Sequence, residues 1–332
     1  MRAILIWLTK WGIGFGAILL ACGVATIWFG GSVSLPAVTV RDGTYVVLDR
    51  YFREAVPRVV LVGSSLTSRL REEYFVTPGV FNLTVTGGSP LTGLEIVASR
   101  PPLPAVILVE ANMLSRPADA DLVEKYAKAG RGRPWFFRPV RWAVASYERW
   151  NHGPDSHARV ASFLDALIGQ RPADFDNTIY LKRALNEFEA DDPTERLQTN
   201  ILLLKRLLES VEKRGSRVLL FELPYEESLE RARFAVISRR MIHDAFPDAD
   251  RWLHIDYPRE DLRWADGVHM DERSSVLASR LLEQALSSRI HGWIEGGRSP
   301  FEPCADDPAQ NRRFQLPWCG GRRTAARSTS HL

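Results

Sequence analysis

The stretch VVLVGSSLT, residues 59–67, joins a run of strand-forming residues to a small polar ending. Residues 59–62 are the aliphatic types that favour a strand buried on both faces. Gly63-Ser64-Ser65 then ends that strand. Two interpretations of this ending are open: a serine that caps a helix beginning near Thr67, or a serine that acts as a nucleophile.

Similar strand patterns recur along the chain and alternate with helical patterns. We expect strands at 58–62, 79–83, 105–110, 217–223 and 252–255, and helices at 67–74, 91–99, 193–213, 227–246 and 271–290. Short apolar strands separated by helices predict a mainly parallel sheet with helices on both faces. Residues 58–290 are therefore expected to form an α/β domain, a three-layer α/β/α sandwich of flavodoxin-like kind.

One segment, residues 115–185, interrupts this alternation. Tryptophan, phenylalanine and arginine are concentrated between positions 131 and 150. This insertion could cap a site and stack sugar rings, dock a membrane partner, or form a small hydrophobic cluster of its own. We favour the last as the simplest of the three.

Residues 1–31 predict a membrane anchor. Trp11–Gly31 contains no charged residue, and a helix of that length spans roughly 30 Å, which matches a bilayer core. Arg2 and Lys10 precede the run, so the short N-terminal end is expected in the cytoplasm. The run is longer than the apolar region of a usual signal peptide. A lipoprotein cleavage box at LLAC, with Cys22 acylated, is the alternative. Both interpretations leave the protein attached to a membrane and facing outward, and the uncleaved anchor predicts a single pass through the inner membrane with the domain facing the periplasm.

The remaining segments and the composition add few constraints. The 332 residues are 45% hydrophobic and 25% charged, as in globular proteins, and the net charge of +3 is too small to indicate a nucleic-acid partner. Residues 32–57 are expected to connect the anchor to the domain, with a short helix at 48–56. Residues 291–332 form a polar tail. Its Cys304 and Cys319 form a disulfide in an oxidising compartment, or else remain two unrelated thiols.

The candidate site consists of residues that follow the strands, because ligands of open parallel sheets bind beyond the carboxyl ends of the strands. A serine nucleophile needs an imidazole to take its proton, and the imidazole needs a carboxylate to orient it. The attack of the serine on an acyl carbonyl places a negative charge on the carbonyl oxygen, and this oxyanion needs preorganised N–H donors. The sequence offers these groups as Ser65, Gly87, Asn112, Asp266 and His269. No cysteine or carboxylate spacing around the other histidines indicates a metal site.

These motifs resemble the four sequence blocks of the SGNH, or GDSL, hydrolase superfamily. The matching residues are Gly-x-Ser-Leu at 63–66, Asn-x-x-x-x-Gly at 82–87, the asparagine at 112 and Asp-x-x-His at 266–269. The resemblance covers about residues 58–290. It implies that Ser65 is the nucleophile and, with Gly87 and Asn112, an oxyanion donor. It also implies that His269 is the base and Asp266 its orienting acid, with no cofactor.

Three residues depart from that family pattern. Ser64 stands where the family usually has aspartate, Glu110 where it has glycine, and Met113 where aspartate follows the asparagine. With the anchor, they make the chain similar to divergent members that work in exopolysaccharide O-acetylation or in D-alanine transfer to teichoic acids. That resemblance implies a carbohydrate substrate and a membrane-bound O-acyltransferase as partner.

The first functional expectation is therefore an acyltransferase or acylesterase that works through an acyl-Ser65 intermediate. The alternative is a catalytically inactive protein of SGNH fold that binds a polysaccharide or a membrane-bound O-acyltransferase. Glu110 motivates this alternative, because a carboxylate facing the oxyanion hole would oppose the charge that develops there. A plain lipid esterase is a third reading.

Overall fold

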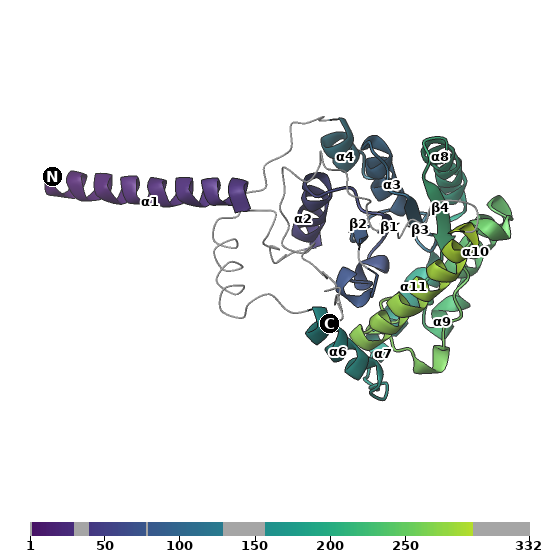
Figure 1. Cartoon of the computed structure of the whole chain (residues 1–332). Helices are drawn as coiled ribbons and strands as arrows, with labels where there is room; N and C mark the ends of the chain where they lie inside the picture. Colours follow the sequence, from purple (N-terminus) through teal and green to yellow (C-terminus); the bar gives the residue numbers. More distant parts are fainter. Residues whose placement is uncertain (1, 30–39, 78, 129–156, 295–332) are drawn as a thin grey trace, which may run out of the picture.

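A four-stranded, all-parallel sheet forms the centre of the protein (Figure 1). The computed structural model describes residues 2–29, 40–77, 79–128 and 157–294. The strands are β1 (Val59–Gly63), β2 (Val80–Thr84), β3 (Val106–Glu110) and β4 (Arg217–Phe221), in the spatial order β2-β1-β3-β4. The expected α/β class with a parallel sheet is confirmed.

The four strands end level with one another. Gly63 of β1 pairs with Thr84 of β2, and Glu110 of β3 pairs with Phe221 of β4. The segments that follow these strands therefore leave the same edge of the sheet, so nearby side chains can come from segments far apart in the chain.

The buried side chains of the strands divide between two hydrophobic clusters, each of which also contains residues of helices. Val60, Val62 and Ile107 belong to one hydrophobic cluster, while Val59 and Leu61 belong to the other. The first cluster includes residues of α2 (Val40–Arg53), α3 (Pro90–Ser99), α4 (Ala120–Val123) and α8 (Thr194–Glu212). The second includes residues of α7 (Thr178–Ala190), α9 (Glu227–Glu230) and α11 (Glu272–Ile294), and α10 (Arg233–Ala245) contributes to both.

Three expected elements are wrong or only partly formed. The fifth strand is reduced to one bridge, between Trp252 and Leu220. The helix at 67–74 is two short 3₁₀ turns, Thr67–Arg69 and Glu72–Tyr74. The helix at 227–246 is divided into α9 and α10 because the backbone is extended at Ala232.

The segment between the anchor and β1 is more than a connection. Its helix α2 begins at Val40, earlier than expected, and its Leu48 and Tyr51 are fully buried in the first cluster. This helix packs mainly along β2. The domain therefore starts before residue 58, because these side chains complete its core.

Part of the insertion is helical. It contributes α4, a π-helical turn at Glu124–Lys128, α6 (His157–Ile168) and the start of α7. Leu164 of α6 forms a small third cluster with Tyr74 and Val276. The stretch rich in tryptophan and arginine lies outside the described residues, as do both cysteines of the tail.

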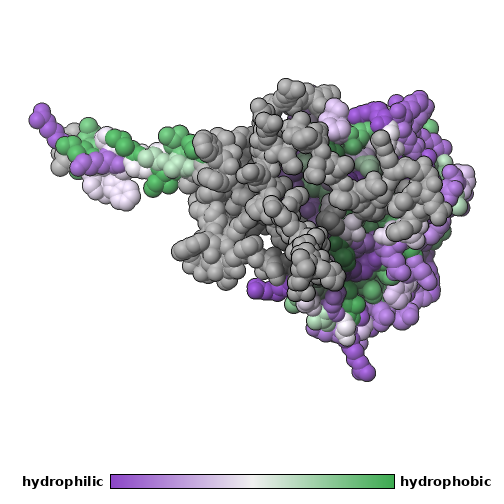
Figure 2. Space-filling view, viewed as in Figure 1, coloured by the Kyte–Doolittle hydropathy of each residue, from purple (hydrophilic) through white to green (hydrophobic). Residues whose placement is uncertain are grey.

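The N-terminal helix α1 (Arg2–Phe29) stands apart from the sheet and its covering helices (Figure 1). Its window Ile4–Ala21 is apolar and long enough to cross a membrane, and none of it is buried inside the protein. Figure 2 shows hydrophobic side chains over much of its visible surface. The helix begins before Trp11 because the residues around Leu5 continue the apolar run.

Candidate active site

Three side chains predicted from the sequence meet at the carboxyl edge of the sheet. Ser65 Oγ lies 2.8 Å from Nε2 of His269, and Nδ1 of that imidazole lies 2.7 Å from Oδ2 of Asp266. The serine belongs to the turn after β1, and His269 lies 204 positions further along the chain, on the same loop before α11 as Asp266. All three are partly exposed, so a reactant can reach them from solvent.

The Asp266–His269 loop is a compact turn with its own hydrogen bonds. Asp266 Oδ1 accepts from the backbone N–H of Val268 at 3.0 Å and of His269 at 2.7 Å. Gly267 has φ +85°, a conformation that glycine adopts without strain. The carboxylate thereby holds the backbone of the histidine as well as its ring.

These contacts keep Asp266 ionised. Burial alone would raise the pKa of Asp266, but hydrogen bonds from the ring and backbone of His269, the charge of that ring, and the N–H of Val268 together lower it to about 2. An ionised carboxylate on Nδ1 leaves Nε2 to face the serine and stabilises the imidazolium that forms when Nε2 takes a proton.

We expect Asp266→Asn to change how protein stability depends on pH. A lowered pKa in the folded state adds stability that is present above the unfolded-state pKa of about 3.9, and this stability is lost as the pH falls through about 2. The difference in unfolding free energy between the wild type and the variant should therefore shrink between pH 5 and pH 2.5.

Urea unfolding at these two pH values measures that difference. Asp244→Asn is the control, since Asp244 is an exposed carboxylate on α10. A difference for Asp266→Asn that stays constant with pH, like that of the control, would contradict the prediction.

The predicted oxyanion donors surround the same edge of the sheet. Gly87 lies in an exposed turn with φ +80°, which a hydrogen bond from Gly88 N–H to the Val85 carbonyl closes at 2.8 Å. Among the described residues, the backbone N–H groups of Ser65 and Gly87 donate to no other group. Both donors are thus available to a ligand.

Asn112, the third predicted donor, is buried and held by the segment after β4. Its Nδ2 donates to the carbonyl of Leu223 at 2.8 Å, and its Oδ1 accepts from the N–H of the same residue at 2.8 Å. These bonds use one of the two Nδ2 hydrogens and fix the amide plane. The second hydrogen is the one that an oxyanion role would require.

The segment after β4 also contacts the Asp266–His269 loop and the residue Trp264 that precedes it. Trp264 Nε1 donates to the carbonyl of Pro224 at 3.0 Å, and the N–H of Glu226 donates to the carbonyl of Gly267 at 3.1 Å. Residues 222–226 therefore contact Asn112 on one side and the Asp266–His269 loop on the other.

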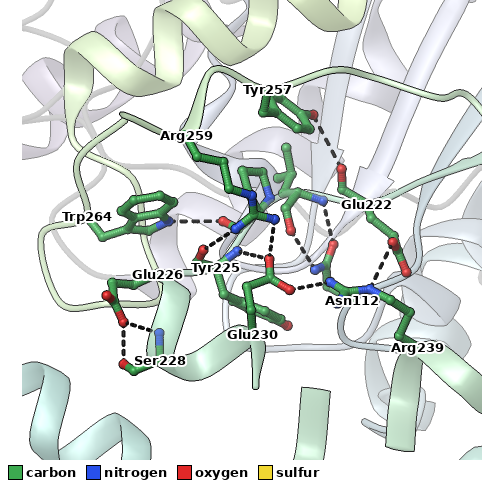
Figure 3. A network of polar contacts seen from close by, with 12 residues as sticks. Asn112, Glu222, Tyr225, Glu226, Ser228, Glu230, Arg239, Tyr257, Arg259 and Trp264 are labelled. Carbon is green, nitrogen blue, oxygen red and sulfur yellow. Dashed lines mark hydrogen bonds and ion pairs between the residues drawn. The ribbon is translucent and has the colours of Figure 1, made fainter. Parts of the chain in front are cut away.

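An ion-pair network holds this segment in turn. Glu230 accepts from Arg239 at 2.5 Å, from Arg259 at 2.8 Å and from the backbone N–H of Tyr225 at 2.9 Å (Figure 3). Arg259 also donates to the Tyr225 carbonyl at 3.2 Å. Sequence reasoning missed these residues, although Tyr225 follows a strand end and the rule that found Asn112 applies to it.

Glu110 is oriented into the protein, toward the turn that carries Ser65. Its carboxylate is 0% exposed and accepts hydrogen bonds from Ser64 and Thr67. Its charge is thus solvated by neutral donors on either side of Ser65. This orientation weakens the argument for inactivity that the position of Glu110 suggests.

A groove with a volume of about 770 Å³ lies beside the Asp266–His269 loop. Its lining includes the aromatic rings of Phe175 and Trp264 together with Glu226 and Arg263. Phe175 is 44% exposed. In the part of the chain that the structure describes, no group of three or more histidine, cysteine or acidic residues is arranged to hold a metal ion.

No protein-family model matches the chain, and neither a curated protein nor a solved structure is significantly similar to it.

Proposed function

We propose that the protein is a membrane-anchored serine acyltransferase or acylesterase of SGNH type. Its domain, with helices on both faces of the sheet, would be the three-layer α/β/α sandwich of that superfamily. The main support for the proposal is the pair of contacts made by the His269 ring. Its Nε2 lies 2.8 Å from Oγ of Ser65, and its Nδ1 lies 2.7 Å from Oδ2 of Asp266. This is the arrangement that acyl transfer through a serine needs.

The first half of the reaction forms an acyl-enzyme. Ser65 Oγ attacks the acyl carbonyl while Nε2 of His269 takes the hydroxyl proton. The N–H groups of Ser65 and Gly87 and the free hydrogen of the Asn112 amide receive the negative charge on the carbonyl oxygen. The bond to the leaving group then breaks, and the proton on Nε2 passes to that group.

The second half releases the acyl group. A sugar hydroxyl or water gives its proton to Nε2 of His269 and attacks the ester of Ser65, and the serine regains a proton as its bond to the acyl group breaks. Water as acceptor makes the protein a deacetylating esterase, and a sugar hydroxyl makes it an O-acetyltransferase.

The proposal includes a location and a partner. α1 anchors the protein in the inner membrane as a single pass, and Arg2 at its start favours a cytoplasmic N-terminus with the domain in the periplasm. A membrane-bound O-acyltransferase would then supply acyl groups from the same membrane.

Labelling with a fluorophosphonate probe tests the proposal, because the probe reacts only with an activated serine. We expect the full-length protein in detergent to be labelled at Ser65 and the Ser65→Ala variant to remain unlabelled. Ser68→Ala is the matched control: Ser68 lies in the same turn and donates to the carbonyl of Ser65 at 2.7 Å, so its hydroxyl is already engaged.

The outcome separates the two main functions. An unlabelled wild type that binds polysaccharide would identify a binding protein without catalytic activity. Labelling that persists in Ser65→Ala would remove Ser65 from the mechanism. If the wild type is labelled, the destination of the acetyl groups separates the two activities. Acetyl groups found on the polysaccharide identify a transferase, and acetyl groups released to water identify an esterase.

A further inference from the structure

The Glu110 carboxylate accepts hydrogen bonds from two residues, one on each side of Ser65 in the chain. Ser64 donates to it from its backbone N–H at 2.8 Å and from its Oγ at 2.7 Å. Thr67 donates from its backbone N–H at 3.3 Å and from its Oγ1 at 2.5 Å. The carboxylate thus holds the residue before Ser65 and the residue two positions after it.

These bonds determine the shape of the turn from which Ser65 projects. Ser64 Oγ also accepts from the N–H of Leu66 at 3.2 Å, so the same hydroxyl contacts Glu110 and closes the turn. With residue 64 and residue 67 fixed to one rigid group at the end of β3, the backbone torsions at Ser65 have little freedom. Those torsions decide where Oγ lies relative to His269.

The donor set suits the two oxygens of a carboxylate. All four groups that face Glu110 are N–H or O–H donors of Ser64 and Thr67, and a carboxylate offers two oxygens that only accept. A glutamine in the same place would present an amide NH₂ to at least one donor. No ion pair to Glu110 occurs within the described residues, so the four bonds solvate its charge.

We propose that Glu110 is a positioning residue for Ser65, acting through Ser64 and Thr67. This inference depends on the proposed function, because it concerns the reactivity of the same serine. The geometry also indicates a second position from which a carboxylate could act. An aspartate at 64 would accept from the N–H groups of Leu66 and Thr67, as an N-cap does.

Rates of fluorophosphonate labelling of the full-length protein test this role. We expect Glu110→Gln to react about 10- to 100-fold more slowly than the wild type, as a small displacement of a nucleophile does. Glu110→Gly should lose at least as much. The double variant Glu110→Gly/Ser64→Asp should recover to within a few-fold of the wild-type rate, because the carboxylate returns from position 64.

Ser216→Ala is the control for a general loss of stability. Ser216 is a buried serine just before β4, at the opposite end of the sheet, and its Oγ donates to the Pro104 carbonyl at 2.7 Å. This variant should lose thermal stability and keep its labelling rate. Equal labelling of Glu110→Gln and wild type would overturn the positioning role while leaving the proposed function intact, and so would a double variant no faster than Glu110→Gly.

A second measurement keeps the two proposals separate. The ¹⁵N resonances of the His269 ring, assigned with His269→Gln, report the contact with Ser65 whether or not the wild type reacts with the probe. In Glu110→Gln they should move toward their values in Ser65→Ala, and in Ser216→Ala they should not move. Resonances that stay unchanged in Glu110→Gln would overturn the positioning role even for a protein that the probe does not label.

Discussion

We expect His269→Ala to lower kcat/KM for a chromogenic acetyl ester by about 10,000-fold or more, and the addition of Ser65→Ala to cause almost no further loss. Residues that act as one unit show this non-additivity, because the loss of either one already stops proton transfer from the nucleophile. In this protein the unit is one chain of contacts, with a single imidazole between Oγ and the Asp266 carboxylate.

The measurement is ester hydrolysis by the two single variants and the double variant, each checked for folding by circular dichroism. His254→Ala is the matched control, since His254 is an exposed histidine in the segment that leads to the catalytic loop. It should keep the wild-type rate. Losses that multiply between Ser65→Ala and His269→Ala would show that the two residues act in separate steps, contrary to the proposed mechanism.

Gly63→Ala, at the last residue of β1, should destabilise the protein and displace the turn that follows it. A Cβ at this position would lie 2.5 Å from Cβ of Thr67 and 2.7 Å from Oε2 of Glu110. These groups are held by hydrogen bonds to each other, so they cannot move apart without breaking contacts. Overpacking of this kind costs about 1–3 kcal/mol of unfolding free energy, and the displaced turn should also reduce ester hydrolysis.

Urea unfolding of the full-length protein in detergent measures the stability effect. Gly169→Ala is the control, because Cβ at that exposed position, just after α6, would meet atoms only at ordinary distances of 3.5 and 3.6 Å. Its unfolding free energy should stay within about 0.5 kcal/mol of the wild type. A Gly63→Ala variant as stable and active as this control would show that the turn can relax.

From the sequence alone, four strands of the parallel sheet and the three residues Ser65, Asp266 and His269 that meet at its edge could be predicted. Hydrophobic strands with polar ends are a local pattern, and the parallel arrangement brings their ends together. The features that the sequence patterns did not predict depend on contacts between segments that are far apart in the chain. Asn82 Nδ2 donates to the carbonyls of Thr67 and Leu70 at 2.7 and 2.6 Å, and these carbonyls then favour short 3₁₀ turns over the expected helix at 67–74.

The direction of a side chain at a strand end is equally hard to predict. The alternation of a strand puts Glu110 and Asn112 on one face only if the strand continues. In fact β3 ends at Glu110. The carboxylate of Glu110 contacts the turn after β1, and the amide of Asn112 contacts Leu223 after β4. Their partners lie more than 40 residues away, beyond any pattern of spacing.

The turn from Asp266 to His269 holds its carboxylate and its imidazole as one body, because Asp266 contacts both the ring and the backbone of His269. The contact between Nε2 and Oγ joins this body to Ser65 on a separate turn. Under the proposed mechanism, a movement that separates the two turns would stop proton transfer from Ser65 and still leave the imidazole with its carboxylate partner, so renewed contact between the turns would be enough to restore the reaction.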